Sequence, residues 1–137
     1  MTHALPRSAR ILAALLAAGT AAAVLTRATH KPALAAPPAI GSEDHQILSP
    51  HGPWVRSLTI PGSGASCCDE SDCRPVDARR GPNGWQVRWR PGQLPGAPTE
   101  WTDVPESAVL VSDNPTGIPI ACWHGGAVRC FVPASAT

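Results

Sequence analysis

The chain has 137 residues and a formal net charge of +1, with 11 basic and 10 acidic side chains. This length is enough for one domain with a modest core. All ten acidic residues lie after residue 35, where they outnumber seven arginines and no lysine occurs. This balance lacks the basic stripe of a nucleic-acid-binding protein, so we expect no nucleic-acid partner.

Residues 1–35 have the layout of a secretory signal peptide. Arg7 and Arg10 form a positive head, and residues 11–25 are an uncharged apolar run. Ala33-Leu34-Ala35 then offers small residues at the positions that a signal peptidase reads. The apolar run is shorter than the ~20 residues that span a bilayer as a helix. We therefore expect a periplasmic or secreted protein with no stable membrane anchor after cleavage.

The segment after the leader is punctuated by Pro and Gly. Residues 36–53 predict a flexible tether, whose only apolar pair is Ile47-Leu48. Residues 54–61 place apolar side chains at every second position, with Arg56 out of pattern, and predict an edge strand. The expected organisation is a signal peptide (1–35), a tether (36–53), a β-rich domain (54–133) and a tail (134–137).

The clearest strand signal is "GWQVRWR" at residues 84–90. Trp85, Val87 and Trp89 fall on one face and polar side chains on the other, as a half-buried strand requires. After a Pro- and Gly-rich loop, residues 99–105 predict a further strand, and residues 106–111 predict a turn followed by a short strand. No long uninterrupted helix pattern occurs, so the sequence predicts a small all-β fold, an SH3-like or partly open β-barrel.

The C-terminal part predicts a β-hairpin around Gly125-Gly126-Ala127. If these residues form a three-residue loop, His124 faces Val128 and Cys122 faces Cys130. Directly opposed cysteines on antiparallel strands can lie within disulfide range. The face expected to be shared consists of Ile120, Cys122, Val128, Cys130 and Val132.

Three of the five cysteines lie in "SGASCCDESDCRP", residues 63–75. Ser66 and Asp69 have the spacing of a helix capping box, which predicts one helical turn over residues 67–72. Cysteines in an exported chain usually form disulfides. We expect two disulfides from the cluster to the hairpin and one thiol left over, while a local hairpin bond stays open. The expected pairing joins Cys73 to one of Cys122 and Cys130, and Cys67 or Cys68 to the other.

Two resemblances concern the mature part of the chain. The order of "GWQVRW", a loop and "EWTDVPESAVL" resembles part of a bacterial SH3-like domain. More extensively, "SCCDESDCRPV", the following Trp strand and the final "C…VRCFVP" resemble a family of small exported proteobacterial proteins of unknown function. That resemblance implies an exported domain with paired cysteines, and it implies no activity.

The residues favour a non-enzymatic module that binds a protein, a peptide or a glycan, or that has a structural role. Exposed tryptophans are natural contact residues, although each could instead belong to the core. No catalytic motif, phosphate loop or dinucleotide fingerprint occurs, and no cofactor is expected. The candidate contact residues are Trp85, Trp89, Trp101 and Trp123.

The alternative function is the binding of copper or zinc by soft ligands. Cys67, Cys68 and Cys73 together with His124 could supply thiolates and an imidazole. The cluster reads C-C-x4-C and so lacks the C-x-x-C motif of metal sites and of thiol–disulfide oxidoreductases.

Overall fold

The computed structural model describes residues 35–135. The predicted signal peptide, except Ala35, and the last two residues of the predicted tail therefore lie outside the described residues. All of the described residues belong to one unit of the chain.

Short helices precede a set of short strands. The helical elements are α1 (Glu43–Leu48), η2 (Ser49–His51), α2 (Gly52–Ser57) and η3 (Glu106–Ala108). The strands are β1 (Cys73–Pro75), β2 (Asp77–Gly81), β3 (Gly84–Arg88), β4 (Thr102–Asp103), β5 (Ile120–His124) and β6 (Ala127–Val132).

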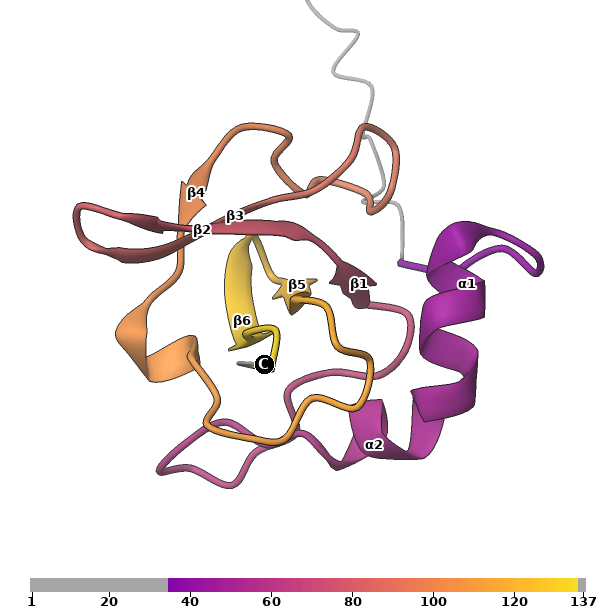
Figure 1. The fold of residues 1–137 in the computed structure, drawn as a ribbon, viewed down its shortest axis with the longest axis horizontal. Helices are drawn as coiled ribbons and strands as arrows, with labels where there is room; N and C mark the ends of the chain where they lie inside the picture. The colour runs from indigo at the N-terminus through magenta and orange to yellow at the C-terminus, as the bar shows by residue number, and fades with distance from the viewer. Residues whose placement is uncertain (1–34, 136–137) are drawn as a thin grey trace, which may run out of the picture. The chain divides into compact units, whose positions relative to one another are not determined.

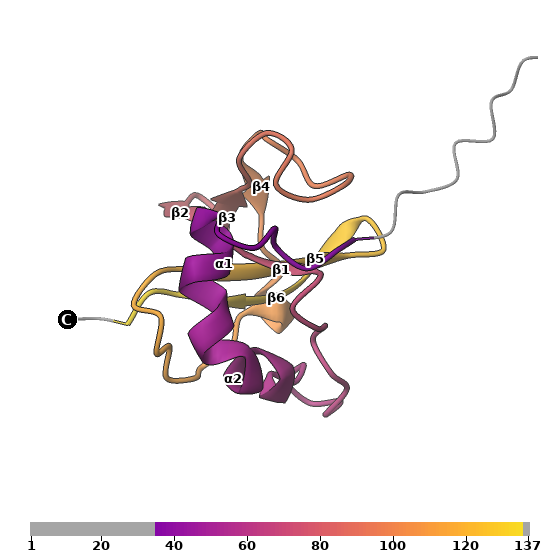
Figure 2. The same ribbon diagram turned by 90° about the vertical axis from the view of Figure 1, so that its right-hand side faces the viewer.

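The strands form two antiparallel sheets, ordered β1-β5-β6 and β2-β3-β4. The second sheet lies across one side of the β5–β6 hairpin, and α1 and α2 lie along another side (Figures 1 and 2). Two disulfides, Cys67–Cys130 and Cys73–Cys122, cross-link this arrangement. The predicted small all-β, disulfide-stapled fold is confirmed, and its finer likeness to an SH3-like barrel stays a prediction.

The β5–β6 hairpin is buried on both faces. Ile120 and Val132, with the disulfide cysteines, pack in one cluster with Leu48 and Val55 of the helices. Ala121 and Phe131 belong to a second cluster, which includes buried residues of β3 and of the segment just after it. A strand that is covered on both faces needs apolar residues at consecutive positions, which explains the run "IAC" in β5. The hairpin is therefore the layer between the helices and the second sheet.

The register of the hairpin confirms one expectation and corrects another. Cys122 does lie opposite Cys130, as predicted. The loop, however, consists of Gly125 and Gly126 alone, both with positive φ, so His124 faces Ala127 and not Val128. A bulge then shifts the register between Cys122 and Trp123. Because of this shift, Val128 packs in the cluster of the second sheet and not on the cysteine face.

The predicted strand around "GWQVRWR" is confirmed as β3. Val87 is buried between the layers, and Trp89, just beyond the strand, is 2% exposed. Strand β4 occupies only Thr102–Asp103 of the predicted segment 99–105. The turn predicted after it is η3, and Val109 then forms an isolated parallel bridge with Phe131.

The prediction of a flexible tether is wrong, and of the edge strand predicted over residues 54–61 only an isolated bridge at Thr59 forms. Residues 43–57 are largely helical, and Ser42 caps α1 by accepting a hydrogen bond from the backbone N–H of His45 at 3.2 Å. Leu48 and Val55, 2% and 0% exposed, anchor the helices in the core. Pro53, which in the sequence indicates a chain break, stands in the first turn of α2. Its missing N–H costs no helical hydrogen bond there.

The helical turn expected over residues 67–72 is also absent. Ser66 forms a β-bridge with Thr59, and the N–H of Cys67 donates to the carbonyl oxygen of Leu58 at 2.9 Å. This pairing keeps the backbone extended where the capping box predicted a helix start. A turn forms instead at residues 69–72, where the Asp69 carboxylate accepts a hydrogen bond from the N–H of Ser71 at 2.7 Å.

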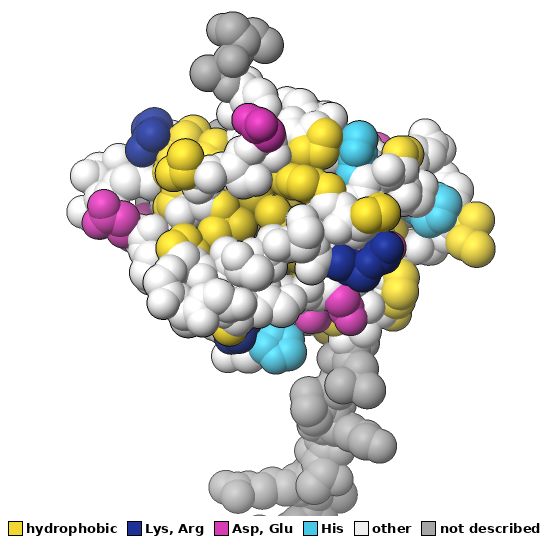
Figure 3. Space-filling view, turned by 90° about the horizontal axis from the view of Figure 1, so that it is seen from below, with side chains coloured by type: hydrophobic (Ala, Val, Ile, Leu, Met, Phe, Trp, Pro, Cys, Tyr) yellow, Lys and Arg dark blue, Asp and Glu magenta, His cyan; other side chains and the backbone are white. Residues whose placement is uncertain are grey.

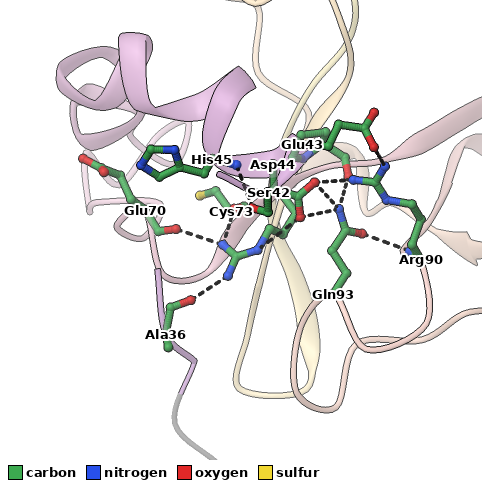
Figure 4. A network of polar contacts seen from close by, with 11 residues as sticks. Ala36, Ser42, Glu43, Asp44, His45, Glu70, Cys73, Arg90 and Gln93 are labelled. Carbon is green, nitrogen blue, oxygen red and sulfur yellow. Dashed lines mark hydrogen bonds and ion pairs between the residues drawn. The ribbon is translucent and has the colours of Figure 1, made fainter. Parts of the chain in front are cut away.

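A buried polar network joins α1 to the rest of the domain (Figure 4). Asp44, 9% exposed, lies beside Arg74, 3% exposed, with 3.7 Å between Oδ2 and Nε. Arg90 and Gln93 also bind the Asp44 carboxylate. Burial lowers the pKa of Arg74 below its ordinary value, whereas the carboxylate of Asp44 opposes that shift. The Arg74 guanidinium in addition donates to the carbonyl oxygen of Ala36 at 2.6 Å, which fixes the chain ahead of α1.

We predict that Asp44→Ala lowers the free energy of unfolding by about 3 kcal/mol, because it leaves the buried Arg74 guanidinium without its carboxylate. The matched control is Asp77→Ala, which removes the partner of Arg88 from an exposed ion pair and should cost about 0–1 kcal/mol. Urea denaturation followed by tryptophan fluorescence measures both. Equal losses in the two variants would show that the network does not anchor α1.

Candidate functional site

An open groove of about 740 Å³ lies where the second sheet meets the chain that follows η3. Arg80 and Trp85 form one side, residues 109–113 form the other, and residues 133–135 close one end. We call it the Trp85 groove. A smaller groove of about 210 Å³ lies against the same segment and is lined by Leu58, Pro61 and their neighbours. The segment 110–112 is therefore a ridge between two hollows.

The wall of the Trp85 groove is a cross-strand pair. Arg80 of β2 lies opposite Trp85 of β3, and its guanidinium carbon is 4.1 Å from the centre of the indole ring. Trp85 also contacts Phe131, with 5.3 Å between the ring centroids. Packing against Phe131 fixes the indole from inside, while Arg80 adds a cation–π contact and a positive charge at the rim.

The ridge combines an apolar side chain with unpaired backbone groups. Val111 is fully exposed, and within residues 35–135 only Val111 and Ile40 are exposed large apolar side chains. Leu110 still donates its N–H to the carbonyl oxygen of Phe131 at 2.8 Å. Within residues 35–135, the N–H groups of residues 111–113 have no backbone partner. Figure 3 shows hydrophobic side chains gathered across the lower side of the molecule, where the chain after η3 runs in Figure 1.

The four predicted contact tryptophans have different surroundings. Trp89 is 2% exposed and meets Trp123 edge to face, with centroids 5.4 Å apart, so Trp89 belongs to the core and Trp123 to its border. Trp85 lines the groove. Trp101 is half-buried and lies beneath the guanidinium groups of Arg79 and Arg88, 4.1 and 4.8 Å from its ring centre.

Trp101 belongs to a flat polar surface on the outer face of the β2-β3-β4 sheet. Gln86 accepts from Arg79 at 2.9 Å and donates to Asp103 at 2.7 Å. Arg88 pairs with Asp77 at 2.9 Å. The polar groups of this surface thus already bind one another. On the other face of the sheet, the Trp85 groove is bordered by the N–H groups of residues 111–113, which have no backbone partner. The sequence did not single out Val111 or Arg80 as contact residues, because neither the apolar run at residues 108–111 nor the arginine pair at residues 79–80 matches a binding motif.

The cysteines pair as the sequence predicted. Cys73 is bonded to Cys122 and Cys67 to Cys130, so the local Cys122–Cys130 bond does not form although these residues face each other. Cys68 is the free cysteine. Burial, followed by the charge of Asp72, raises the pKa of its thiol to about 12.

The predicted metal-ligand set is not assembled as thiolates. Cys67 and Cys73 are oxidised in separate disulfides, and the Nδ1 of His124 lies 3.4 Å from the Oδ2 of Asp72. A different trio converges instead: the sulfur atoms of Cys68, Cys73 and Cys122 lie within 4.8 Å of one another. Two of these three sulfurs are bonded together, so the trio offers a single thiol.

We predict that the stability of the protein falls as pH rises from 9 towards 12 and that Cys68→Ser reduces this fall. The thiol ionises in the unfolded chain near its ordinary pKa of 9.0, while in the folded chain its pKa is about 12. As the pH rises, the thiol therefore loses its proton in the unfolded state first. The contribution of Cys68 to the free energy of unfolding is complete below pH 9 and is lost as the pH rises from 9 towards 12. Thermal melting of both proteins at pH 8 and pH 10 measures the difference, and parallel curves would contradict it.

No family model, curated protein or solved structure matches this chain. Among the described residues, no helix combines the length and the apolar character needed to cross a membrane.

Proposed function

We propose that this protein is an exported, non-enzymatic module that binds an extended peptide segment of a partner protein in the Trp85 groove. The observation that carries the proposal is the juxtaposition of Trp85, Arg80 and the exposed Val111 around one hollow. Among the partners expected from the sequence, a peptide fits this site better than a glycan, because the groove offers main-chain donors beside an apolar surface.

Three contacts define the peptide that would fit. An apolar side chain would pack on Trp85 and Val111, burying surface that water now covers. A carboxylate would meet the guanidinium of Arg80 at the groove rim. The carbonyl groups of an extended chain would accept from alternate N–H groups of residues 111–113, as in recognition by strand addition.

Export fits the covalent chemistry of the domain. Two disulfides indicate an oxidising compartment. The signal-like segment 1–35 and the resemblance to small exported proteins favour the periplasm or the exterior. A module cross-linked in this way presents a preorganised groove, so that binding loses little entropy in ordering the site.

We predict that Val111→Asp and Arg80→Glu each weaken peptide binding at least tenfold. The probe is a displayed library of random dodecapeptides panned against the immobilised protein, followed by affinity measurements on single enriched peptides. We expect the enriched peptides to combine an acidic and an apolar residue. Each variant removes one of the two contacts: the apolar ridge or the positive rim.

Matched controls stand beside both residues. Ile40→Asp alters another exposed large apolar side chain, and Arg79→Glu reverses the neighbouring charge on the opposite face of the same strand. Neither should change affinity. Failure to enrich any peptide, or equal losses in Arg79→Glu and Arg80→Glu, would refute a peptide site in this groove.

We predict that residues 1–35 export alkaline phosphatase when fused to its mature sequence, because that enzyme becomes active only where its own disulfides form. Replacing Leu15 and Leu16 by arginine interrupts the apolar run and should abolish the activity. Equal activity of the two fusions would show that the apolar run does not direct export. That result would not bear on peptide binding in the Trp85 groove.

A further inference from the structure

The free thiol of Cys68 lies against a disulfide. Its sulfur is within 4.8 Å of both sulfurs of the Cys73–Cys122 bond. The two bonded cysteines are 0% and 1% exposed, and Cys68 is half-buried. The Cys68 thiol, a nucleophile, thus lies beside a disulfide that it could attack, and both groups are at least half-buried. Neither group belongs to the proposed peptide site.

Local structure explains why the three sulfurs meet. The turn at Asp69–Asp72, closed by the N–H of Asp72 donating to the carbonyl oxygen of Asp69 at 3.2 Å, places Cys68 and Cys73 at its two ends. Strand β1 then pairs with β5 so that Cys73 faces Cys122. The turn and the strand pairing thus bring the three sulfur atoms together.

We propose that Cys68 exchanges with the Cys73–Cys122 disulfide. The Cys68 thiolate attacks the Sγ of Cys122, a Cys68–Cys122 bond forms, and the Cys73–Cys122 bond breaks. Cys73 leaves as a thiolate and takes up the proton that Cys68 lost. The number of disulfides stays the same, so the step needs no oxidant or reductant. The proposal goes beyond the proposed function and does not rest on it.

Attack on Cys122 keeps the hairpin tied to the cluster, which is why we assign Cys122 as the attacked sulfur. A Cys68–Cys122 bond still closes a loop of about fifty residues, so it restricts the unfolded chain about as much as the bond that it replaces. Attack on Cys73 would instead close a short loop around the turn and release the hairpin. The exchanged protein therefore keeps the fold but frees β1 from its covalent bond to β5.

The charges around Cys68 make the exchange slow at neutral pH and faster in alkali. Burial and the carboxylates of Asp72 and Asp69 raise its pKa to about 12, while Arg129 acts in the opposite direction. His124, beside Asp72, can offset that carboxylate only when the imidazole is protonated. Because the thiolate is the nucleophile, the rate should rise about tenfold for each pH unit below the pKa.

The first experiment follows the position of the free thiol in the protein purified after export. Samples incubated between pH 7.5 and 9.5 are quenched in acid, denatured and alkylated with N-ethylmaleimide, and the labelled residue is mapped by mass spectrometry. We expect the label on Cys68 at the start and on Cys73 with time, about tenfold faster per pH unit. Label that stays on Cys68 at pH 9.5 overturns the proposal, and label on Cys122 overturns the assignment of the attacked sulfur.

The second experiment removes the leaving group. Cys73→Ser leaves Cys68 and Cys122 as an unbonded pair, which should form a disulfide with oxidised glutathione as the oxidant, so that the intact mass falls by two hydrogens and includes no glutathione. The control Cys130→Ser leaves Cys67 and Cys68 unbonded. A bond between these sequence neighbours would close a strained ring, so their thiols should stay free or carry glutathione. Free thiols or bound glutathione in Cys73→Ser as well would show that Cys68 does not reach Cys122.

Discussion

The fold depends on two covalent bonds that end on the same hairpin. Cys67–Cys130 and Cys73–Cys122 join residues separated by 63 and 49 positions in the sequence. In the chain-entropy description, a cross-link over such a loop contributes ~4 kcal/mol by restricting the unfolded chain. A domain of this size has a total stability of about 5–15 kcal/mol. Each bond is therefore a large part of what keeps short strands and one-turn helices assembled.

The two bonds also explain why the hairpin can be buried on both faces. The cysteine side of β5 and β6 packs on the helices, and the Phe131 side packs on the second sheet. Neither outer layer is extensive enough to fold alone, since β4 has two residues and α1 has six. The outer layers are held because they share the hairpin. The Trp85 groove lies where the second sheet meets the chain that follows η3, and Trp85, which packs against Phe131, lines it.

The third cysteine of the cluster has a different relation to the fold. Cys68 is placed next to a disulfide by a turn and a strand pairing, and burial raises the pKa of its thiol to about 12. Because the thiolate is the nucleophile in thiol–disulfide exchange, this raised pKa slows the proposed exchange at neutral pH. The Trp85 groove and the sulfur cluster are separate features of one small domain.

The sequence by itself predicted that two disulfides join the cysteine cluster to the hairpin, and it predicted the clearest strands. Period-two alternation in residues 84–90 predicted β3, and the glycines at 125 and 126 predicted the hairpin. Cys122 does lie opposite Cys130, but the loop is one residue shorter than predicted and a bulge restores that register. It could not place α1 and α2, because Leu48 and Val55 become one apolar surface only when they meet the cysteine face of the hairpin. The tertiary structure also decided the bulge, which moves Val128 to the other face, and the choice of two disulfides from the cysteine cluster to the hairpin over a local Cys122–Cys130 bond. These outcomes depend on contacts between distant segments, and periodicity within a single segment carries no information about such contacts.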